Sequence, residues 1–253
     1  MRVILAGATG FIGSEILEQL IAHNYVSEIY CLLRNTLAPK YRKSPKVHML
    51  LHDNFEEYPV HIIQKLRDGG AEACIWAAGG EIHKFKGLDE ARRVNIHFPL
   101  QAAEAFSRDL AAALDPNPPP NTSKFPFRFV FISETRAEQD SNKSLWFYAD
   151  SRRIKGAAEK GLFDIADQSK EKEVSVGTYK RCFEVIALRP GAVVPKGEAL
   201  SKYFAEATST ACAVDRLASC AIRAAMQGTG GKRILENADC LGKDWALINT
   251  LTL

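Results

Sequence analysis

Short runs of aliphatic and aromatic residues alternate along the chain with segments whose apolar residues recur at helical spacing. Residues 3–6 are a continuous apolar run and predict a buried strand, and apolar residues at 12, 16, 17, 20 and 21 then predict a helix. Further apolar runs predict strands at 28–34, 46–51, 73–78, 127–133 and 183–190, and helical spacing predicts helices near 56–68, 88–114, 145–162 and 213–227. This alternation predicts an α/β fold with a doubly wound parallel sheet.

The chain has 253 residues, which suits a single domain spanning 1–253. Two stretches interrupt the alternation. Residues 115–126 are rich in proline, which lacks the backbone N–H, so we expect an exposed loop. Residues 167–181 are polar and charged, and we interpret them as a surface insertion. Residues 195–253 are expected to form the substrate-side end of the same domain.

The sequence GATGFIG follows the first predicted strand and opens the first predicted helix. Glycine permits a tight turn and close backbone approach, and a helix N-terminus offers free N–H groups and the positive end of a dipole. Strand, G-x-x-G-x-x-G and amphipathic helix together favour a dinucleotide-binding loop. The alternative is a glycine-rich turn in another α/β fold, whereas a P-loop is disfavoured because no Gly-Lys-Ser/Thr follows. The predicted cofactor-binding residues here are Gly7, Thr9, Gly10, Phe11, Ile12 and Gly13.

Ligands of such sheets bind at the carboxyl ends of the strands, so the residues after each strand are candidates. Arg34 follows the second strand, and no carboxylate stands there. In an NAD-binding site a carboxylate at this place would hydrogen-bond to the ribose hydroxyls. Because arginine can bind a 2′-phosphate in bidentate fashion, Arg34 favours NADP over NAD, although a strand-end arginine in solvent is the alternative. Asp53 and Asn54 follow the third strand and could bind adenine.

The later strand ends predict the nicotinamide side of the site. Ala77, Ala78 and Gly79 are small enough for a cofactor to lie against the backbone. Ser133, followed by Glu134 and Thr135, would place a hydroxyl near the nicotinamide. Pro190 and Gly191 form a turn that, with Val193, would close over the same ring. The predicted site residues at these strand ends are therefore Ala77, Ala78, Gly79, Ser133, Pro190, Gly191 and Val193.

These motifs appear in an order that resembles the short-chain dehydrogenases/reductases: GATGFIG, AAGG, FIS, a helix with Lys155, and LRPGAVV. KGAAEKG, RPG and RILENADCLG resemble an atypical branch that contains the human Tat-interacting metastasis-suppressor protein and its fungal mitochondrial relatives. The resemblance implies a Rossmann fold, NADP binding and a Ser/Thr–Tyr–Lys catalytic group with Tyr and Lys four residues apart. It also suggests that Asn95 structures the site; a plain helix-surface asparagine is the alternative.

The catalytic motif departs from the family pattern, and two registers are possible. Tyr148 with Arg152 keeps the tyrosine and loses the lysine, whereas Ser151 with Lys155 keeps the lysine and loses the tyrosine. Glu159 and the sequence KGAAE match the family in the second register, which we favour. A serine hydroxyl is far less acidic than a phenol, so proton transfer would be impaired. Lys155 could still hold the nicotinamide ribose hydroxyls.

Two functions follow from these residues. The first is an NADP(H)-dependent reductase that passes hydride to a carbonyl or related small substrate, with Lys155, Ser133, Ser151 and Tyr148 as candidate catalytic residues. The second is an NADP(H)-binding regulatory or scaffold protein with little turnover and a possible protein partner. The missing tyrosine adds weight to the second function.

Composition narrows the partners and the compartment. A formal net charge of +3 gives no indication of nucleic-acid binding. The six cysteines lie far apart and, with the isolated His83 and His97, predict no metal site. No apolar run is long enough to span a membrane. A first strand so close to Met1 leaves no room for a signal peptide, so a cytoplasmic location is expected, with the mitochondrial outer surface as the alternative that the resemblance implies.

Overall fold

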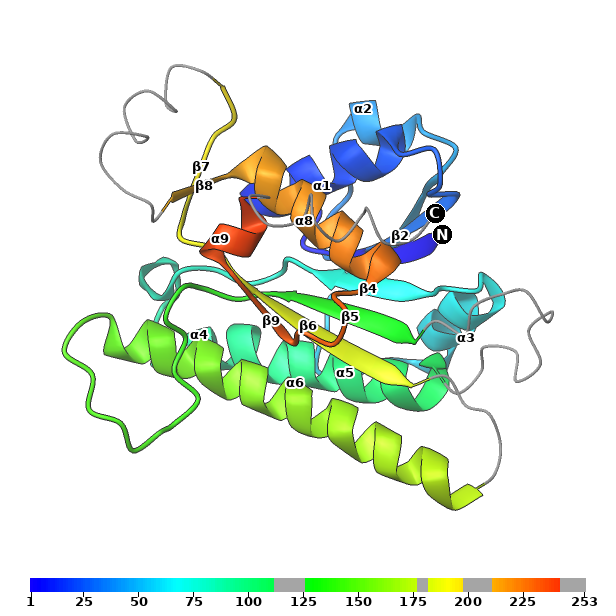
Figure 1. Ribbon diagram of the computed structural model, residues 1–253. Helices are drawn as coiled ribbons and strands as arrows, with labels where there is room; N and C mark the ends of the chain where they lie inside the picture. Colours follow the sequence, from blue (N-terminus) through cyan, green and yellow to red (C-terminus); the bar gives the residue numbers. More distant parts are fainter. Residues whose placement is uncertain (112–125, 177–181, 198–210, 242–253) are drawn as a thin grey trace.

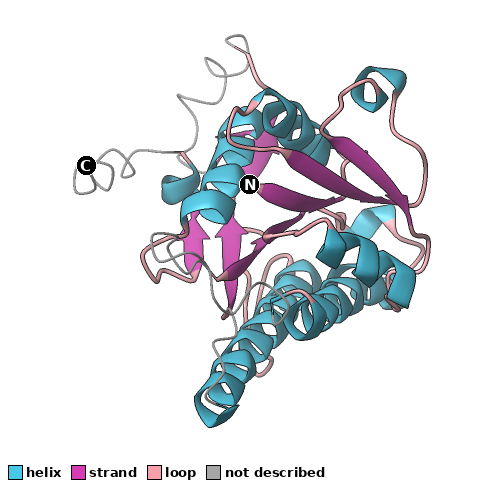
Figure 2. Cartoon of the chain, turned by 90° about the vertical axis from the view of Figure 1, so that its right-hand side faces the viewer, coloured by secondary structure: helices cyan, strands magenta, loops and turns pink. Residues whose placement is uncertain are grey.

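The computed structural model describes residues 1–111, 126–176, 182–197 and 211–241, in which a seven-stranded parallel sheet lies between two layers of helices (Figures 1 and 2). The sheet has the strand order β3-β2-β1-β4-β5-β6-β9, and β7 pairs with β8 in a separate ladder. The predicted doubly wound parallel sheet is confirmed. The strands are β1 Arg2–Ala6, β2 Glu28–Leu33, β3 Val47–Leu51, β4 Ala73–Trp76, β5 Phe127–Ile132, β6 Phe183–Arg189, β7 Ala192–Val194, β8 Ala211–Ala213 and β9 Ile234–Glu236.

The helices cover both faces of the sheet (Figure 1). They are α1 Phe11–Ala22, α2 Pro39–Arg42, α3 Val60–Asp68, α4 Leu88–Arg92, α5 Phe98–Asp109, α6 Ala149–Val176, α8 Val214–Gln227 and α9 Asn237–Cys240, with a 3₁₀ turn at Ile82–Lys84 and a π-helical turn at Arg93–His97. Helices α1 and α8 pack on one face, and α3, α5 and α6 pack on the other. In the described part of the chain, no helix combines the length and apolarity needed to cross a membrane.

Both faces of the central strands are buried, which explains why these strands are continuous apolar runs in the sequence. Along β1, Val3 and Leu5 belong to the core beneath α1 and α8. Ile4 and Ala6 belong to the core that α5 and α6 cover. All four side chains are fully buried.

The strand order reverses between β1 and β4, and this reversal positions the candidate site. From β1 the chain builds β2 and β3 on one side, and it then returns to pair β4 with the other side of β1. The connections after β1 and β4 therefore diverge to opposite faces of the sheet. In open α/β sheets, the crevice at this point is the usual place for a ligand.

Helix α6 corrects the interpretation of residues 167–181 as a surface insertion. The helix continues to Val176, so 167–176 are helical, and 177–181 lie outside the described residues. Glutamine, lysine and glutamate are good helix formers, which explains how a polar stretch extends an amphipathic helix. The predicted loop at 115–126 also lies almost entirely outside the described residues.

The long helix predicted near 88–114 is interrupted. It divides into α4, the π turn Arg93–His97 and α5, and residues 112–114 are not described. Pro99 explains the interruption, because it has no N–H to donate to the carbonyl of Asn95 and its ring would clash with that carbonyl. A π turn inside a helix often marks a functional position.

Strand β9 was not predicted from the sequence. Its three residues, Ile234–Glu236, are too few to show a periodicity, and their pairing with β6 defines them as part of the sheet. Within the predicted substrate-side end, β8, α8, β9 and α9 occupy 211–241, whereas 198–210 and 242–253 are outside the described residues.

Candidate functional site

The glycine-rich loop joins β1 to α1 and folds closely against the end of β4. Gly7 has a φ of +87°, and a Cβ there would lie 2.5 Å from the backbone of Ala77. Gly13 is buried, and a Cβ there would overlap the carbonyl oxygen of Gly7. The protein's own packing therefore requires both glycines. Gly10 differs, because it is exposed and its Cβ position comes no closer than 3.4 Å to the carbonyl oxygen of Gly7.

The N-terminus of α1 opens at this loop. The helix begins at Phe11 with Gly10 as N-cap, has no side-chain cap and carries no acidic residue in its first turn. Thr9, Gly10 and Phe11 are exposed and Ile12 is half-buried. An uncapped helix N-terminus presents free N–H groups and a partial positive charge, which suit a phosphate.

Arg34 lies directly after β2, the strand beside β1, and its side chain is exposed. It forms no hydrogen bond or ion pair with any residue that the structure describes. Asp53 and Asn54 follow β3, one strand further out, and are also exposed. The Oδ1 atom of Asn54 accepts a hydrogen bond from the N–H of Glu56 at 3.2 Å, so this side chain already shapes the local turn.

Ala77, Ala78 and Gly79 follow β4 directly. Asn95, in the π turn further along the chain, is only 2% exposed. The Oδ1 atom of Asn95 accepts from the N–H of Gly80 at 3.2 Å, and its Nδ2 donates to the carbonyl of Ala91 at 3.0 Å. The π turn thus places this amide inside the fold, against the loop after β4. The buried position argues against a plain helix-surface asparagine.

Lys155 on α6 extends toward the same loop. A Cβ on Gly79 would lie 2.8 Å from Oδ1 of Asn95 and 3.6 Å from Nζ of Lys155, so both side chains converge on Gly79. Nζ donates to the carbonyl of Ile132 at 3.2 Å and lies 5.0 Å from the centre of the Phe131 ring. Burial lowers the pKa of Lys155 to about 8, a shift that the nearby carboxylates partly oppose.

Ser151 and Lys155 are both within α6 and four residues apart, so they share one face of the helix. Ser151 Oγ donates a hydrogen bond to Oε2 of Glu134 at 2.6 Å. The Glu134 carboxylate also raises the pKa of Lys155 by its charge. Glu134 was not predicted as a site residue. Its only signal in the sequence is its place directly after Ser133 at the end of a predicted strand.

Tyr148 and Arg152, the alternative register, are directed elsewhere. Tyr148 precedes the first residue of α6, has a φ of +51° and is 83% exposed. Arg152 donates from Nε to the carbonyl of Arg136 at 2.8 Å and so holds the loop before the helix. The structure thus brings Ser151 and Lys155 toward the loop after β5, and it leaves the Tyr148 side chain at the surface.

Ser133, predicted as catalytic, is directed into a buried ionic network. Its Oγ donates to Oε1 of Glu159 at 2.6 Å, and its side chain is 5% exposed. The fully buried Glu159 also accepts from Gln139 at 2.8 Å and from two nitrogens of Arg189 at 2.9 and 2.5 Å. This network connects the end of β5 with α6 and β6 and thereby fixes the position of α6 against the sheet.

The turn after β6 is held against this same end of the sheet. The carbonyl of Pro190 accepts from the N–H of Thr135 at 2.9 Å, and the N–H of Gly191 donates to Oδ1 of Asn237 at 2.7 Å. Val193 follows in β7 and is half-buried. Pro190 and Gly191 therefore lie beside the loop that carries Glu134.

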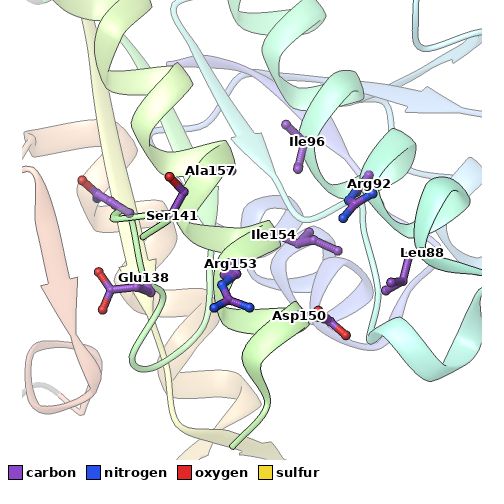
Figure 3. A pocket seen from close by; sticks show the side chains of 10 residues that line it. Leu88, Arg92, Ile96, Glu138, Ser141, Asp150, Arg153, Ile154 and Ala157 are labelled. Atoms are coloured by element: carbon purple, nitrogen blue, oxygen red, sulfur yellow. The ribbon is translucent and has the colours of Figure 1, made fainter. Parts of the chain in front are cut away.

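A cavity of about 180 Å³ lies on another face of α6, between this helix and the segment containing α4 and the π turn (Figure 3). Asp150, Arg153, Ile154 and Ala157 line it from α6. Positions 151, 155 and 159 lie on a different side of the helix, because successive residues turn by about 100°. The cavity therefore contains none of the predicted site residues. Within the described part of the chain, no group of three or more His, Cys, Asp or Glu residues could hold a metal ion.

The comparisons with known proteins agree with this geometry. Residues 5–67, which contain the glycine-rich loop and Arg34, match the NAD-binding family model described as male sterility protein. No protein of curated function matches the sequence.

Many solved structures share the fold. Yeast methylglyoxal/isovaleraldehyde reductase Gre2 complexed with NADPH has a TM-score of 0.66 and 15% identity, covering 93% of this chain and 78% of that chain. Vestitone reductase from alfalfa (Medicago sativa L.) has a TM-score of 0.60 and 16% identity, covering 93% and 76%. UDP-glucose 4-epimerase from the hyperthermophilic eubacterium Thermotoga maritima, with UDP-glucose, has a TM-score of 0.61 and 12% identity, covering 93% and 76%. The chain has the Rossmann-like fold of these reductases and epimerases.

Proposed function

We propose that the protein binds NADP(H) at the carboxyl ends of β1, β2 and β4 and transfers hydride between it and a carbonyl or related small substrate. The observation that carries this proposal is the uncapped N-terminus of α1 beside the exposed Gly10, with Arg34 directly after the neighbouring strand β2, where it pairs with no residue that the structure describes. A pyrophosphate fits the first feature and a 2′-phosphate fits the second. The family model at residues 5–67 and the NADPH of yeast Gre2 support the same cofactor.

The residues present fit the rest of a nicotinamide dinucleotide. Asp53 and Asn54 would border the adenine, and the small residues Ala77 and Ala78 would lie against the cofactor. The Lys155 ammonium would hold the nicotinamide ribose hydroxyls. Asn95 fixes the loop at Gly80 and thereby shapes the floor of the site. When bound, the reduced nicotinamide supplies a hydride.

Membership of the short-chain dehydrogenase/reductase superfamily, and of its atypical Tat-interacting branch, is part of this proposal. The motifs GATGFIG, AAGG and LRPGAVV support the superfamily, and KGAAEKG supports the branch. The branch would also allow a location on the mitochondrial outer surface as an alternative to the cytoplasm.

A second candidate function is that of an NADP(H)-binding regulatory or scaffold protein. One observation favours it: Trp146, Phe147 and Tyr148 are 90%, 77% and 83% exposed, and consecutive exposed aromatic side chains are typical of surfaces that contact other molecules. The replacement of the family tyrosine by Ser151 is consistent with it.

A two-step experiment tests both functions. The fluorescence of NADPH is measured during titration with the protein, and NADPH deuterated at C4 is then incubated with the protein and a pool of small aldehydes, ketones and imines. Binding followed by deuterium in a product supports the oxidoreductase. Binding without transfer supports the regulatory function, and absence of binding overturns both.

A further inference from the structure

Ser151, the hydroxyl at the position of the family tyrosine, already uses its proton within the protein. Ser151 has one hydroxyl proton, and it is donated to Oε2 of Glu134 at 2.6 Å. The remaining hydrogen-bonding capacity of Ser151 Oγ consists of lone pairs, which can only accept hydrogen bonds. The other carboxylate oxygen of Glu134, Oε1, accepts no hydrogen bond from any residue that the structure describes. This pair therefore offers acceptors, where the family places a proton donor.

The charged groups around the pair leave one carboxylate oxygen open. Two carboxylates act on Lys155, those of Glu134 and Glu159. Glu159 is fully buried and compensated by Arg189. Lys155 itself donates to the carbonyl of Ile132 and lies beside Gly79. Glu134 is half-buried and is the carboxylate with an open oxygen.

Such a pair disfavours a carbonyl group and favours a cation. During reduction a carbonyl oxygen gains negative charge and needs a donor, whereas Ser151 and Glu134 would present lone pairs and a negative charge to it. A protonated imine carries a positive charge and an N–H donor, so it matches both groups. Its carbon also accepts hydride without any proton from the protein.

We propose that the substrate is a protonated C=N compound whose N–H is held by Ser151 and Glu134. This inference rests on the proposed oxidoreductase function and specifies its substrate class. In the reaction the C=N carbon gains a hydride from the reduced nicotinamide, which is oxidised to the nicotinamide cation. The π electrons of the C=N bond become a lone pair on nitrogen, and the resulting amine then takes a proton from water to give the ammonium product.

A binding experiment tests the acceptor pair without turnover. Calorimetry in the presence of NADP⁺ compares 2-methylpyrrolidine, a cation at neutral pH, with its neutral analogue 2-methylcyclopentanol. We expect the amine to bind at least about tenfold more tightly, because its hydrogen bonds are charge-assisted. Glu134→Gln should remove this preference while the variant still binds NADP⁺. Glu236→Gln, the matched control, should keep the preference, because Glu236 is a half-exposed carboxylate that pairs with Arg189 and is not part of this pair.

Equal binding of the two ligands, or a preference that survives in folded Glu134→Gln or Glu134→Ala, would overturn the inference. A reaction experiment adds a second measurement: NADPH oxidation with 2-methyl-1-pyrroline should exceed that with 2-methylcyclopentanone in the wild type. In the double variant Glu134→Ser/Ser151→Tyr the ranking should reverse, because a phenol can donate to a carbonyl oxygen. Faster reduction of the ketone by the wild type refutes this substrate class and leaves the oxidoreductase function standing, whereas failure to bind NADPH refutes the function itself.

Discussion

A Cβ atom on Gly13 would overlap the carbonyl oxygen of Gly7, six residues earlier in the same loop. The first turn of α1 therefore rests directly on the turn that leaves β1. Gly7 in turn touches the end of β4, since its Cβ position is 2.5 Å from the backbone of Ala77. The loop is thus shaped by contacts within the protein, and Gly10 is the glycine that faces outward.

This difference separates folding from binding in two variants. Gly13→Ala should lower the free energy of unfolding by about 1–3 kcal/mol or more, because backbone atoms cannot easily move aside. Gly10→Val should change it by less than about 1 kcal/mol, since Gly10 already has an extended conformation with φ −82° and ψ 171°. Gly10→Val should nevertheless weaken NADPH binding by at least tenfold. Chemical denaturation and fluorescence titration measure the two effects, and unchanged NADPH affinity in Gly10→Val would contradict the assignment of the loop.

Arg34 is expected to determine the preference for the phosphorylated cofactor. Its charge-assisted hydrogen bonds should contribute about 1.5–3 kcal/mol each, so Arg34→Ala should weaken NADPH binding ten- to hundredfold and leave NADH binding unchanged. Arg2→Ala is a suitable control, because Arg2 is exposed at the opposite end of the neighbouring strand. Calorimetric titration of both nucleotides decides the matter: equal wild-type affinities for NADPH and NADH are incompatible with this role.

Lys155 should make stability depend on pH in the alkaline range. Burial lowers its pKa from the ordinary 10.5 to about 8, so the unfolded chain binds more protons than the folded chain between these values. The free energy of unfolding contributed by this group should therefore rise as the pH increases from about 8 to 10.5. Below pH 8 the full cost of burying the charge remains, and Lys155→Met should be more stable there by about 1–3 kcal/mol. Urea denaturation from pH 7 to 10 should show the difference between the two proteins shrinking; a constant difference would exclude the buried ammonium.

Glu159 should be the most sensitive position of the network beneath the site. Glu159→Gln leaves the Arg189 guanidinium in a largely buried place without its full counter-charge, and removing one partner of a buried pair costs about 3–5 kcal/mol. Glu236→Gln is the matched control, because Glu236 pairs with the same arginine at 3.3 Å but is half exposed. This control should cost less than about 1 kcal/mol. Similar losses of unfolding free energy in both variants, measured by denaturation, would show that the buried pair contributes no more to stability than the exposed pair.

Tyr148→Phe should leave NADPH binding and turnover unchanged, because its side chain is 83% exposed at the surface before α6. Tyr25→Phe, another tyrosine at the surface, provides the baseline with its 78% exposure. Steady-state kinetics with any substrate found for the wild type measures the effect. A large loss in Tyr148→Phe alone would make Tyr148 the proton donor and would refute the register with Ser151 and Lys155.

Local patterns in the sequence were enough for six of the seven strands of the sheet and for the glycine-rich loop. The central strands are buried on both faces and hence uniformly apolar, and α1 shows its buried face at helical spacing, so each element can be recognised from neighbouring residues alone. The glycines at 7, 10 and 13 are likewise a local signal, since a tight turn excludes other residues. The placement of Ser151 and Lys155 on one helical face also follows from spacing within a single helix.

The contacts between elements needed the folded chain. Ser133 and Glu134 are neighbours at a strand end, where successive side chains point in opposite directions, and a shift of one residue exchanges their surroundings. The sequence favoured the Ser133 hydroxyl, whereas the structure directs it to Glu159 and directs Glu134 to Ser151. Strand β9 and the buried Asn95 are similar cases, because pairing with β6 and packing against Gly80 join residues that are distant in the sequence. Periodicity in the sequence shows which segments form helices and strands. The partner of a side chain at the end of a strand depends on which other element packs against that end, and this is decided by the tertiary structure.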